Sequence, residues 1–402
     1  MLSPSIALLI SIVCILVLLR LRLHPGYAIF VGGVVISLTA MPVSAAPSLL
    51  WQAFWNFETL TLLVVVVAAL AMSSIMQQKG LLLELAGTME KVTPKLAIHV
   101  IPAVIGLVPM PAGAVVSATA GGDLSKKLGL NPEQSTFTNY WFRHIWELSL
   151  PVYSNVIAAS ILLRVSLSTM LATMFPMTVL AVLSGLLVSW WTLRKAPLRT
   201  GKRPPIKTII YKLFRASWPI LLLVIMVLAG LEAIIAFPVV LALLAIVQRA
   251  SLKQVGKALR QGADYKILFL VYAVIFYKII IESSDAALSV FSDMQMLGVP
   301  VMALLVILPL LIGFITGVSI AYVGISFPLL LPIIAPETGI NHYALLLAFT
   351  SGIVGMHLSP LHLCLVLSAE YFKARLINVF KYLVPPSLLM VAVAVLLYFF
   401  LG

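Results

Sequence analysis

Apolar stretches of roughly 16 to 20 residues recur along the whole chain, and short polar segments separate them. A helix that crosses the ~30 Å hydrocarbon core of a bilayer needs about 20 residues, so this pattern is typical of membrane spans. It predicts an all-α polytopic membrane protein with about ten transmembrane helices. The expected spans lie at residues 2–19, 26–41, 59–78, 138–163, 167–193, 217–231, 234–248, 267–283, 342–368 and 383–401.

Two further apolar segments, 97–121 and 299–330, are interrupted by proline and glycine and differ from ordinary spans. In the first, Pro109 and Pro111 remove two backbone donors and exclude a straight helix. Each arm beside this interruption has about 11 residues and would extend ~16–18 Å, which is about half of the hydrocarbon core. We therefore expect both segments to be re-entrant hairpins with tips near the bilayer midplane.

The distribution of Lys and Arg favours this interpretation. If both segments return to the side from which they entered, 23 of the 26 Lys and Arg residues lie in loops on one side, and only Arg164 lies in a loop on the other. Basic residues are enriched in cytoplasmic loops. A full crossing at 97–121 would place the segment 194–216, with eight basic residues and no acid, outside. The expected location is the inner cell membrane, with basic loops in the cytoplasm and the N-terminus outside.

The composition excludes several other classes of protein. The chain is 62% hydrophobic and 10% charged, and its mean hydropathy is +1.13, values that exclude a large soluble domain. The net charge of +13 lies in loops, where it sets orientation and contacts anionic lipid rather than nucleic acid. Cys14 and Cys364 both lie in apolar stretches, so neither a structural disulfide nor a metal cluster is expected. The first apolar stretch lacks a preceding basic region and is expected to be a span, not a cleaved signal.

The order of elements repeats along the chain. Residues 1–193 contain three spans, a hairpin and two spans, and residues 217–402 contain the same series. Because each half crosses the membrane an odd number of times, the second half would be inverted relative to the first. The segment 194–216 would be a basic cytoplasmic linker between two inverted repeats.

One span in each half is interrupted by proline at an equivalent position. Pro151 interrupts the span at 138–163, and Pro360 interrupts the span at 342–368. Matched broken helices in two halves indicate the binding site of a secondary transporter.

This series of spans, hairpins and broken helices resembles the ion transporter superfamily of divalent-anion symporters and gluconate- and citrate-type permeases over nearly the whole chain. Within it, the chain is most similar to a branch of prokaryotic membrane proteins of unknown function. The resemblance implies a scaffold domain, an elevator-like transport domain and a homodimer. It also implies that substrate and coupling ions bind at Pro109–Ala114, Leu150–Asn155, Thr316–Ser319 and Leu358–His362. The Ser-Asn-Thr tip motifs of sodium-coupled dicarboxylate members are absent, so neither sodium coupling nor dicarboxylate preference is implied.

Small residues at the hairpin tips suit close approach to an anion. Helix ends there would present unpaired N–H groups and a favourable dipole. The alternative is that the small residues only allow close helix packing. The candidate substrate- and ion-binding residues of the tips are Pro109, Pro111, Ala112, Gly113, Ala114, Ser117, Thr316, Gly317 and Ser319.

The first broken helix has the richest polar chemistry. Arg143 and Glu147 are four residues apart, which places them on one helix face beside His144. Arg143 could bind a substrate carboxylate, and His144 or Glu147 could hold a coupling proton. The alternative is an Arg143–Glu147 ion pair at the cytoplasmic interface. The other candidates in this segment are Asn139, Pro151, Tyr153 and Asn155.

The second broken helix has His357 and His362 on either side of Pro360, with Ser359 beside the break. The histidines could bind an anion or relay a proton, or they could be structural. Elsewhere, Lys278, Glu282 and Asp285 share a face near the outer end of their span and are expected to neutralise one another.

These patterns favour a non-enzymatic secondary transporter of a small organic anion of the carboxylate type, coupled to H⁺ or Na⁺, without a cofactor or a metal. A cation/proton antiporter or an oxyanion exporter is the alternative within the same superfamily. An intramembrane metalloenzyme that uses His144, Glu147, His357 and His362 is a more distant one, and a channel is another. The expected partners are the anion, the lipid bilayer and a second copy of the chain, with no nucleic acid.

Overall fold

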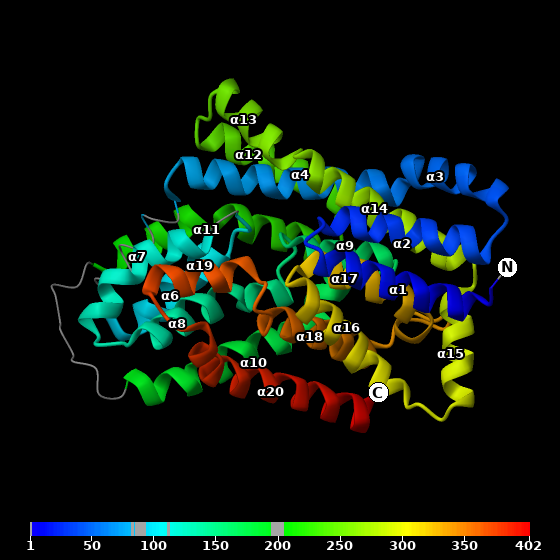
Figure 1. Ribbon diagram of the computed structural model, residues 1–402. Coiled ribbons are helices and arrows are strands. Elements are labelled where there is room, and N and C mark those ends of the chain that lie inside the picture. The colour runs from blue at the N-terminus through cyan, green and yellow to red at the C-terminus, as the bar shows by residue number, and fades with distance from the viewer. Residues whose placement is uncertain (1, 82–83, 85–93, 111–112, 194–204) are drawn as a thin grey trace.

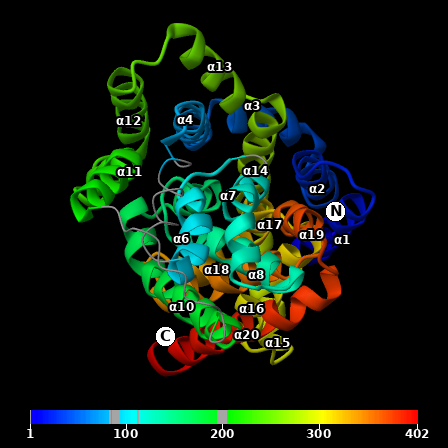
Figure 2. The ribbon, with the colours of Figure 1, turned by 90° about the vertical axis from the view of Figure 1, so that its left-hand side faces the viewer.

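The computed structural model describes residues 2–81, 84, 94–110, 113–193 and 205–402, and every regular element among them is a helix (Figure 1). The predicted all-α class is therefore confirmed for these residues. Most helices run roughly along one axis of the molecule. Figure 2 shows α6, α7, α8, α17 and α18 in the middle, with α11 and α12 on one side, α13 at the top, and α1 and α2 on the other side.

Among the described residues up to 193, the first half of the chain contains eleven helical elements, one of them a short 3₁₀ turn. They are α1 (Pro4–Arg20), α2 (Pro25–Ala40), α3 (Ala46–Trp55), α4 (Phe57–Gln78), α6 (Pro94–Gly106), α7 (Gly113–Lys127), α8 (Pro132–His144), the 3₁₀ helix η2 (Ile145–Leu148), α9 (Ser154–Leu162) and α10 (Leu167–Leu193), with a further short 3₁₀ turn at Val43–Ala45.

The second half follows a similar order. Its helices are α11 (Ile206–Leu228), α12 (Ala233–Val247), α13 (Leu252–Gly262), α14 (Tyr265–Ser283), α15 (Ala286–Met296), α16 (Val301–Thr316), α17 (Ser319–Ile334), α18 (His342–His357), α19 (Leu363–Phe372) and α20 (Leu376–Leu401).

Helix packing follows the same pairing in the two halves. α6 packs on α7 and α8, as α16 packs on α17 and α18. Across the halves, α2 packs on α14 as α12 packs on α4, and α7 packs on α19 as α17 packs on α9. Glycines allow the closest of these contacts: a Cβ on Gly106 would lie 2.1 Å from the Arg143 carbonyl oxygen, and one on Gly355 would lie 2.1 Å from that of Leu310. Each half thus buries a pair of short helices against a broken one.

Four helices of the described residues are long and apolar enough to cross a membrane, namely α4, the portion Leu167–Trp190 of α10, α11 and α20. A fifth is counted if α14 and Ala286–Met294, which are bent by 63° at a short break, form one span. α1, α2 and α12 are apolar but shorter, with 17, 16 and 15 residues. With the apolar composition, these helices identify a membrane protein, while the number of ten spans stays a prediction.

Several segments expected to be loops are helical instead. Residues 206–216 of the predicted linker 194–216 belong to α11, and residues 194–204 lie outside the described residues. The role of this segment as a linker between the halves stays a prediction. Helices α3, α13 and α15 also lie where loops were expected. α13 begins with a capping box formed by Ser251 and Gln254. A search for continuous apolar stretches misses such helices because they are short or amphipathic.

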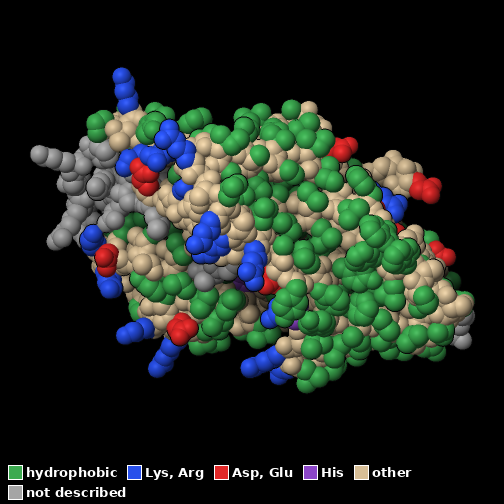
Figure 3. Space-filling view, turned by 90° about the horizontal axis from the view of Figure 1, so that it is seen from above, with side chains coloured by type: hydrophobic (Ala, Val, Ile, Leu, Met, Phe, Trp, Pro, Cys, Tyr) green, Lys and Arg blue, Asp and Glu red, His purple; other side chains and the backbone are tan. Residues whose placement is uncertain are grey.

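Many large hydrophobic side chains are exposed on the helices, as expected of a surface that contacts lipid. Figure 3 shows wide hydrophobic areas on one face, with Lys and Arg side chains gathered toward one end of it. This is the charge asymmetry that the sequence predicts for cytoplasmic loops. The assignment of that end to the cytoplasm remains a prediction.

Candidate functional site

The breaks of the two interrupted helices contain the predicted prolines. Leu148 ends η2 and Ser154 begins α9, so Pro151 lies in the break between them. His357 ends α18 and Leu363 begins α19, so Pro360 lies in the second break. Proline cannot donate to the helical ladder, and it disfavours helical backbone at the residue before it.

The segment that was predicted to form the first hairpin tip contacts the end of α8. The Arg143 Nη2 group donates to the Met110 carbonyl at 3.4 Å, and the Asn139 Nδ2 group donates to the Ala114 carbonyl at 3.0 Å. A Cβ on Gly113 would lie 2.2 Å from Arg143 Nη2, so only glycine allows the guanidinium group to lie against this helix start. Pro109 accepts a hydrogen bond from Ser73 of α4 at 2.5 Å. Pro111 and Ala112 lie outside the described residues.

The second hairpin tip contacts the second break. Gly317 ends α16 with a φ of 62°, and its carbonyl lies 2.7 Å from His362 Nδ1. A Cβ on Gly317 would lie 2.8 Å from the His362 backbone nitrogen, so this position needs glycine for conformation and for space. The Thr316 hydroxyl accepts a hydrogen bond from Val318 N at 3.2 Å, and Ser319 begins α17.

Arg143 lies at the centre of these contacts. Its side chain is only 3% exposed, and its Nη1 lies 3.2 Å from His144 Nε2 and 3.5 Å from Cys364 Sγ. In the part of the chain that the structure describes, no carboxylate oxygen lies within 4.0 Å of its nitrogens, and its Nε has no hydrogen-bond partner. A buried guanidinium group with only long, neutral contacts is incompletely compensated.

The Arg143–Glu147 ion pair, which was the alternative interpretation of this segment, does not occur among the described residues. The α-helix ends at His144 and the chain continues as the tighter helix η2, so residues four apart no longer share one face. Glu147 instead places Oε1 at 3.9 Å from His144 Nε2, and its buried Oε2 has no hydrogen-bond partner.

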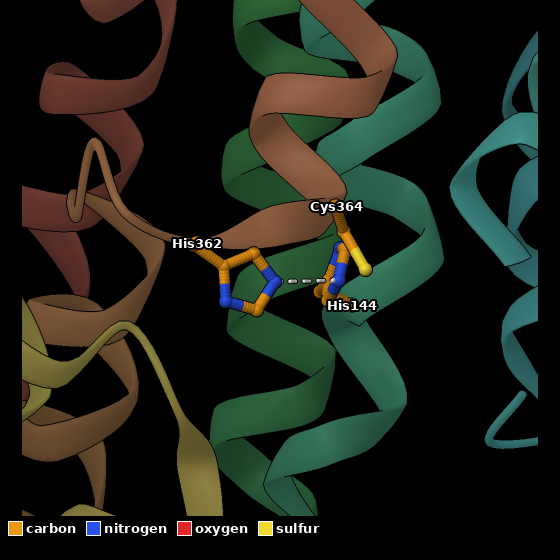
Figure 4. A group of neighbouring side chains, drawn as sticks. All are labelled: His144, His362 and Cys364. Atoms are coloured by element: carbon orange, nitrogen blue, oxygen red, sulfur yellow. Dashed lines mark hydrogen bonds between the residues drawn. The ribbon is translucent and has the colours of Figure 1, made fainter. Parts of the chain in front are cut away.

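Two of the predicted histidines meet across the halves (Figure 4). His144 Nε2 and His362 Nε2 are 3.3 Å apart, and His144 Nδ1 lies 2.6 Å from the Tyr140 carbonyl. Cys364 completes the group, because its Sγ and the ring nitrogens lie within 4.8 Å of one another. Sequence analysis did not select Cys364, although its position two residues after His362 could have indicated it.

His357 is buried next to this group but is not hydrogen-bonded to it. Its ring packs edge-on against those of His144 and Trp141, with centroids 5.7 Å away, and neither of its nitrogens has a partner in the described structure. His357 therefore does not join His144, Glu147 and His362 in the zinc site that was weighed from the sequence.

The remaining predicted residues stabilise the breaks and tips. The Tyr153 hydroxyl donates to the Gly106 carbonyl, and Asn155 Nδ2 donates to the Glu147 carbonyl at 2.9 Å. Ser117 donates to Ala114 of its own helix at 3.1 Å, and Ser359 accepts from Leu361 N at 3.2 Å. These groups hold the site together.

Three helix starts face this region without a side-chain cap. α9, α17 and α19 all begin at a break or tip, and no side chain accepts from their first N–H groups. Their free N–H groups and positive dipole ends favour negative charge. Together with Arg143 they make the meeting point of the two halves favourable for an anion.

Comparison with known proteins assigns the chain to a family and finds a solved structure with a similar fold. Residues 2–401 match the model of a family described as "Protein of unknown function (DUF401)". The chain belongs to this family. A solved structure, that of the YdaH transporter from Alcanivorax borkumensis, is similar with a TM-score of 0.62 and 18% identity over 89% of this chain and 88% of that one. This member of the DUF401 family thus shares the fold of the YdaH transporter. No curated protein matches the sequence.

A pocket of about 160 Å³ adjoins the tips and the first break in this member of the DUF401 family. Its walls are almost entirely apolar. The lining residues are Val66, Ala69, Leu70, Pro109, Val152, Ser154, Ile157, Ile267, Leu270 and Ile320. These residues come from α4 and α14 and from the first tip, the first break and the start of α17.

A second group of charges lies near the N-terminal end of α4. The buried Lys278 Nζ is 2.5 Å from Glu58 Oε2 and 3.9 Å from Glu282 Oε1. Arg164 bridges the same two carboxylates at 3.2 and 3.4 Å. The predicted neutralisation of Lys278 therefore depends mainly on Glu58, which sequence analysis missed. Asp285 lies beyond the end of α14, with a φ of 52°, so it does not share the predicted helix face.

Proposed function

We propose that this protein is a secondary transporter of a small organic anion, and that the anion binds at Arg143. The proposal rests mainly on one observation: a guanidinium group that is 3% exposed, without a carboxylate partner in the described structure, at the meeting point of two helix breaks and two hairpin tips. A substrate carboxylate would complete this charge and could accept two parallel hydrogen bonds from it.

The surroundings favour a substrate with an anionic end and an apolar part. The uncapped starts of α9, α17 and α19 add positive potential, whereas the adjoining pocket offers almost only apolar surface. An organic acid with a hydrocarbon or aromatic portion suits both. A substrate without such a portion would leave the apolar walls of the pocket without an apolar surface to contact.

Transport would follow an elevator-like movement of one domain along the other. The moving part would comprise α6–α10 and α16–α20, which surround Arg143, and the fixed part α1–α4 and α11–α15. The apolar pocket and the Ser73–Pro109 hydrogen bond lie at this boundary.

The matching order and packing of the two halves supports inverted repeats, and the two pairs of short packed helices support re-entrant hairpins. The coupling ion is H⁺ or Na⁺, and the assembly is a homodimer in the inner membrane.

A thermal-shift panel tests the proposal on purified protein. The panel contains aliphatic and aromatic mono- and dicarboxylates, sugar acids and sulfonates, with and without sodium at two pH values. We expect at least one organic acid to raise the melting temperature progressively, since a ligand at a hundred times its Kd stabilises the folded state by about 2.7 kcal/mol. The matching uncharged amide or alcohol should have no effect. A panel without any anion-specific shift would contradict an anion site.

A further inference from the structure

The two facing histidines suggest which ion accompanies the anion. Building on the proposed function, we infer that His144 and His362 share one proton between their Nε2 atoms, and that this proton is the coupling ion. The inference rests on the orientation of both rings and on the separation of the two Nε2 atoms.

Backbone carbonyls fix the other nitrogen of each ring. His144 Nδ1 lies 2.6 Å from the Tyr140 carbonyl, and His362 Nδ1 lies 2.7 Å from the Gly317 carbonyl. A carbonyl oxygen only accepts hydrogen bonds, so both Nδ1 atoms carry the proton. In two neutral rings, both Nε2 atoms therefore have a lone pair and no hydrogen.

The two Nε2 atoms lie 3.3 Å apart, and neither of them carries a hydrogen. Arg143 Nη1, at 3.2 Å, donates to His144 Nε2, but no other hydrogen bond to His362 Nε2 occurs in the described structure. One added proton on His362 Nε2 would donate to His144 Nε2, whose single lone pair it would share with the Arg143 Nη1 donor. Since one ring comes from each half of the chain, the proton holds the two breaks together.

The neighbouring groups link this proton to the anion. Arg143 on α8 opposes a second positive charge, whereas Glu147 on η2, 3.9 Å from His144 Nε2, offsets it. The other titratable groups that face the pair are Tyr140 on α8, His357 on α18 and Cys364 on α19. With Arg143 charged and Glu147 ionised, the site has no net charge without the proton and a charge of +1 with it. Proton and anion therefore bind cooperatively, which is the requirement for symport.

Other cations suit the site less well. Sodium prefers several oxygen ligands, whereas the converging atoms here are two nitrogens and a sulfur. A soft divalent metal ion would accept these atoms. However, the Arg143 guanidinium group lies 3.2 Å from one of the nitrogens and 3.5 Å from the sulfur, and it would repel such an ion.

Nitrogen NMR of the protein labelled with ¹⁵N-histidine, in nanodiscs and without any ligand, tests the inference from about pH 4 to about pH 9. We expect one exchangeable proton that couples to two Nε2 nitrogens. The signal should disappear in His144→Gln and His362→Gln and persist in the exposed control His342→Gln. The wild-type spectrum decides the question even if a buried variant fails to fold.

Two results would overturn the inference. One is a wild-type spectrum without a shared proton at any pH in this range. The other is stoichiometric zinc uptake that shifts both Nε2 signals and survives dialysis. Because the spectrum needs no transported anion, a shared proton together with a failed anion panel would refute the anion site and the coupling role of the proton, but not the shared proton itself.

Discussion

Arg143→Gln is expected to lower organic-anion uptake by at least about 100-fold, which corresponds to roughly 2.7 kcal/mol. The substitution removes the positive charge and both parallel donors that a carboxylate would use. Arg143→Lys should retain part of the uptake, since the charge remains but the planar pair of donors is lost. Uptake into proteoliposomes of the anion identified by the thermal-shift panel measures both effects.

Arg260→Gln is the matched control for this experiment. Arg260 is exposed on α13, far along the chain from the breaks, and its replacement should leave uptake unchanged. Normal uptake by folded Arg143→Gln would remove the central residue from the proposal. Equal losses in both variants would indicate a nonspecific effect of net charge.

Glu58→Gln is expected to destabilise the protein by about 3 kcal/mol, the lower end of the range for breaking a buried ion pair. The Lys278 side chain is fully buried, and Glu58 is its nearest carboxylate at 2.5 Å. Glu282 at 3.9 Å compensates only partly. Equilibrium unfolding in micelles should therefore show a clear loss of stability.

The double variant Glu58→Gln/Lys278→Met should recover much of the stability lost in Glu58→Gln. It removes the buried charge together with its partner, and methionine occupies a similar volume. Glu337→Gln, at an exposed position, provides the control. If Glu58→Gln unfolds at the same denaturant concentration as the wild type, the close Glu58–Lys278 pair does not contribute as described.

The positions of the helix breaks followed from local chemistry. Pro109 lies in the interruption between α6 and α7, Gly317 in that between α16 and α17, and Pro151 and Pro360 in the two broken helices. Proline removes a donor and glycine permits a left-handed backbone, and both effects act within a few residues. Such features can be located without knowing the tertiary structure.

Contacts between distant segments could not be found in this way. Glu58 and Lys278 are 220 residues apart, and the neighbourhood of His144 and His362 depends on how the two halves pack. The shared helix face predicted for Arg143 and Glu147 was wrong because the α-helix tightens into a 3₁₀ helix between the two residues. The 3₁₀ helix at Ile145–Leu148 thus leaves Arg143 without a carboxylate partner among the described residues, and this changes the chemistry of the site.

Alkylation of Cys364 tests the central claim most directly. The chain has two cysteines, so Cys14→Ser leaves Cys364 as a single reporter, with its Sγ 3.5 Å from Arg143 Nη1. An anion bound at Arg143 should slow the reaction with a small maleimide about tenfold at ten times its Kd, and Arg143→Gln should abolish the protection. Alkylation that proceeds at the same rate with a saturating concentration of the transported anion would contradict a binding site at Arg143.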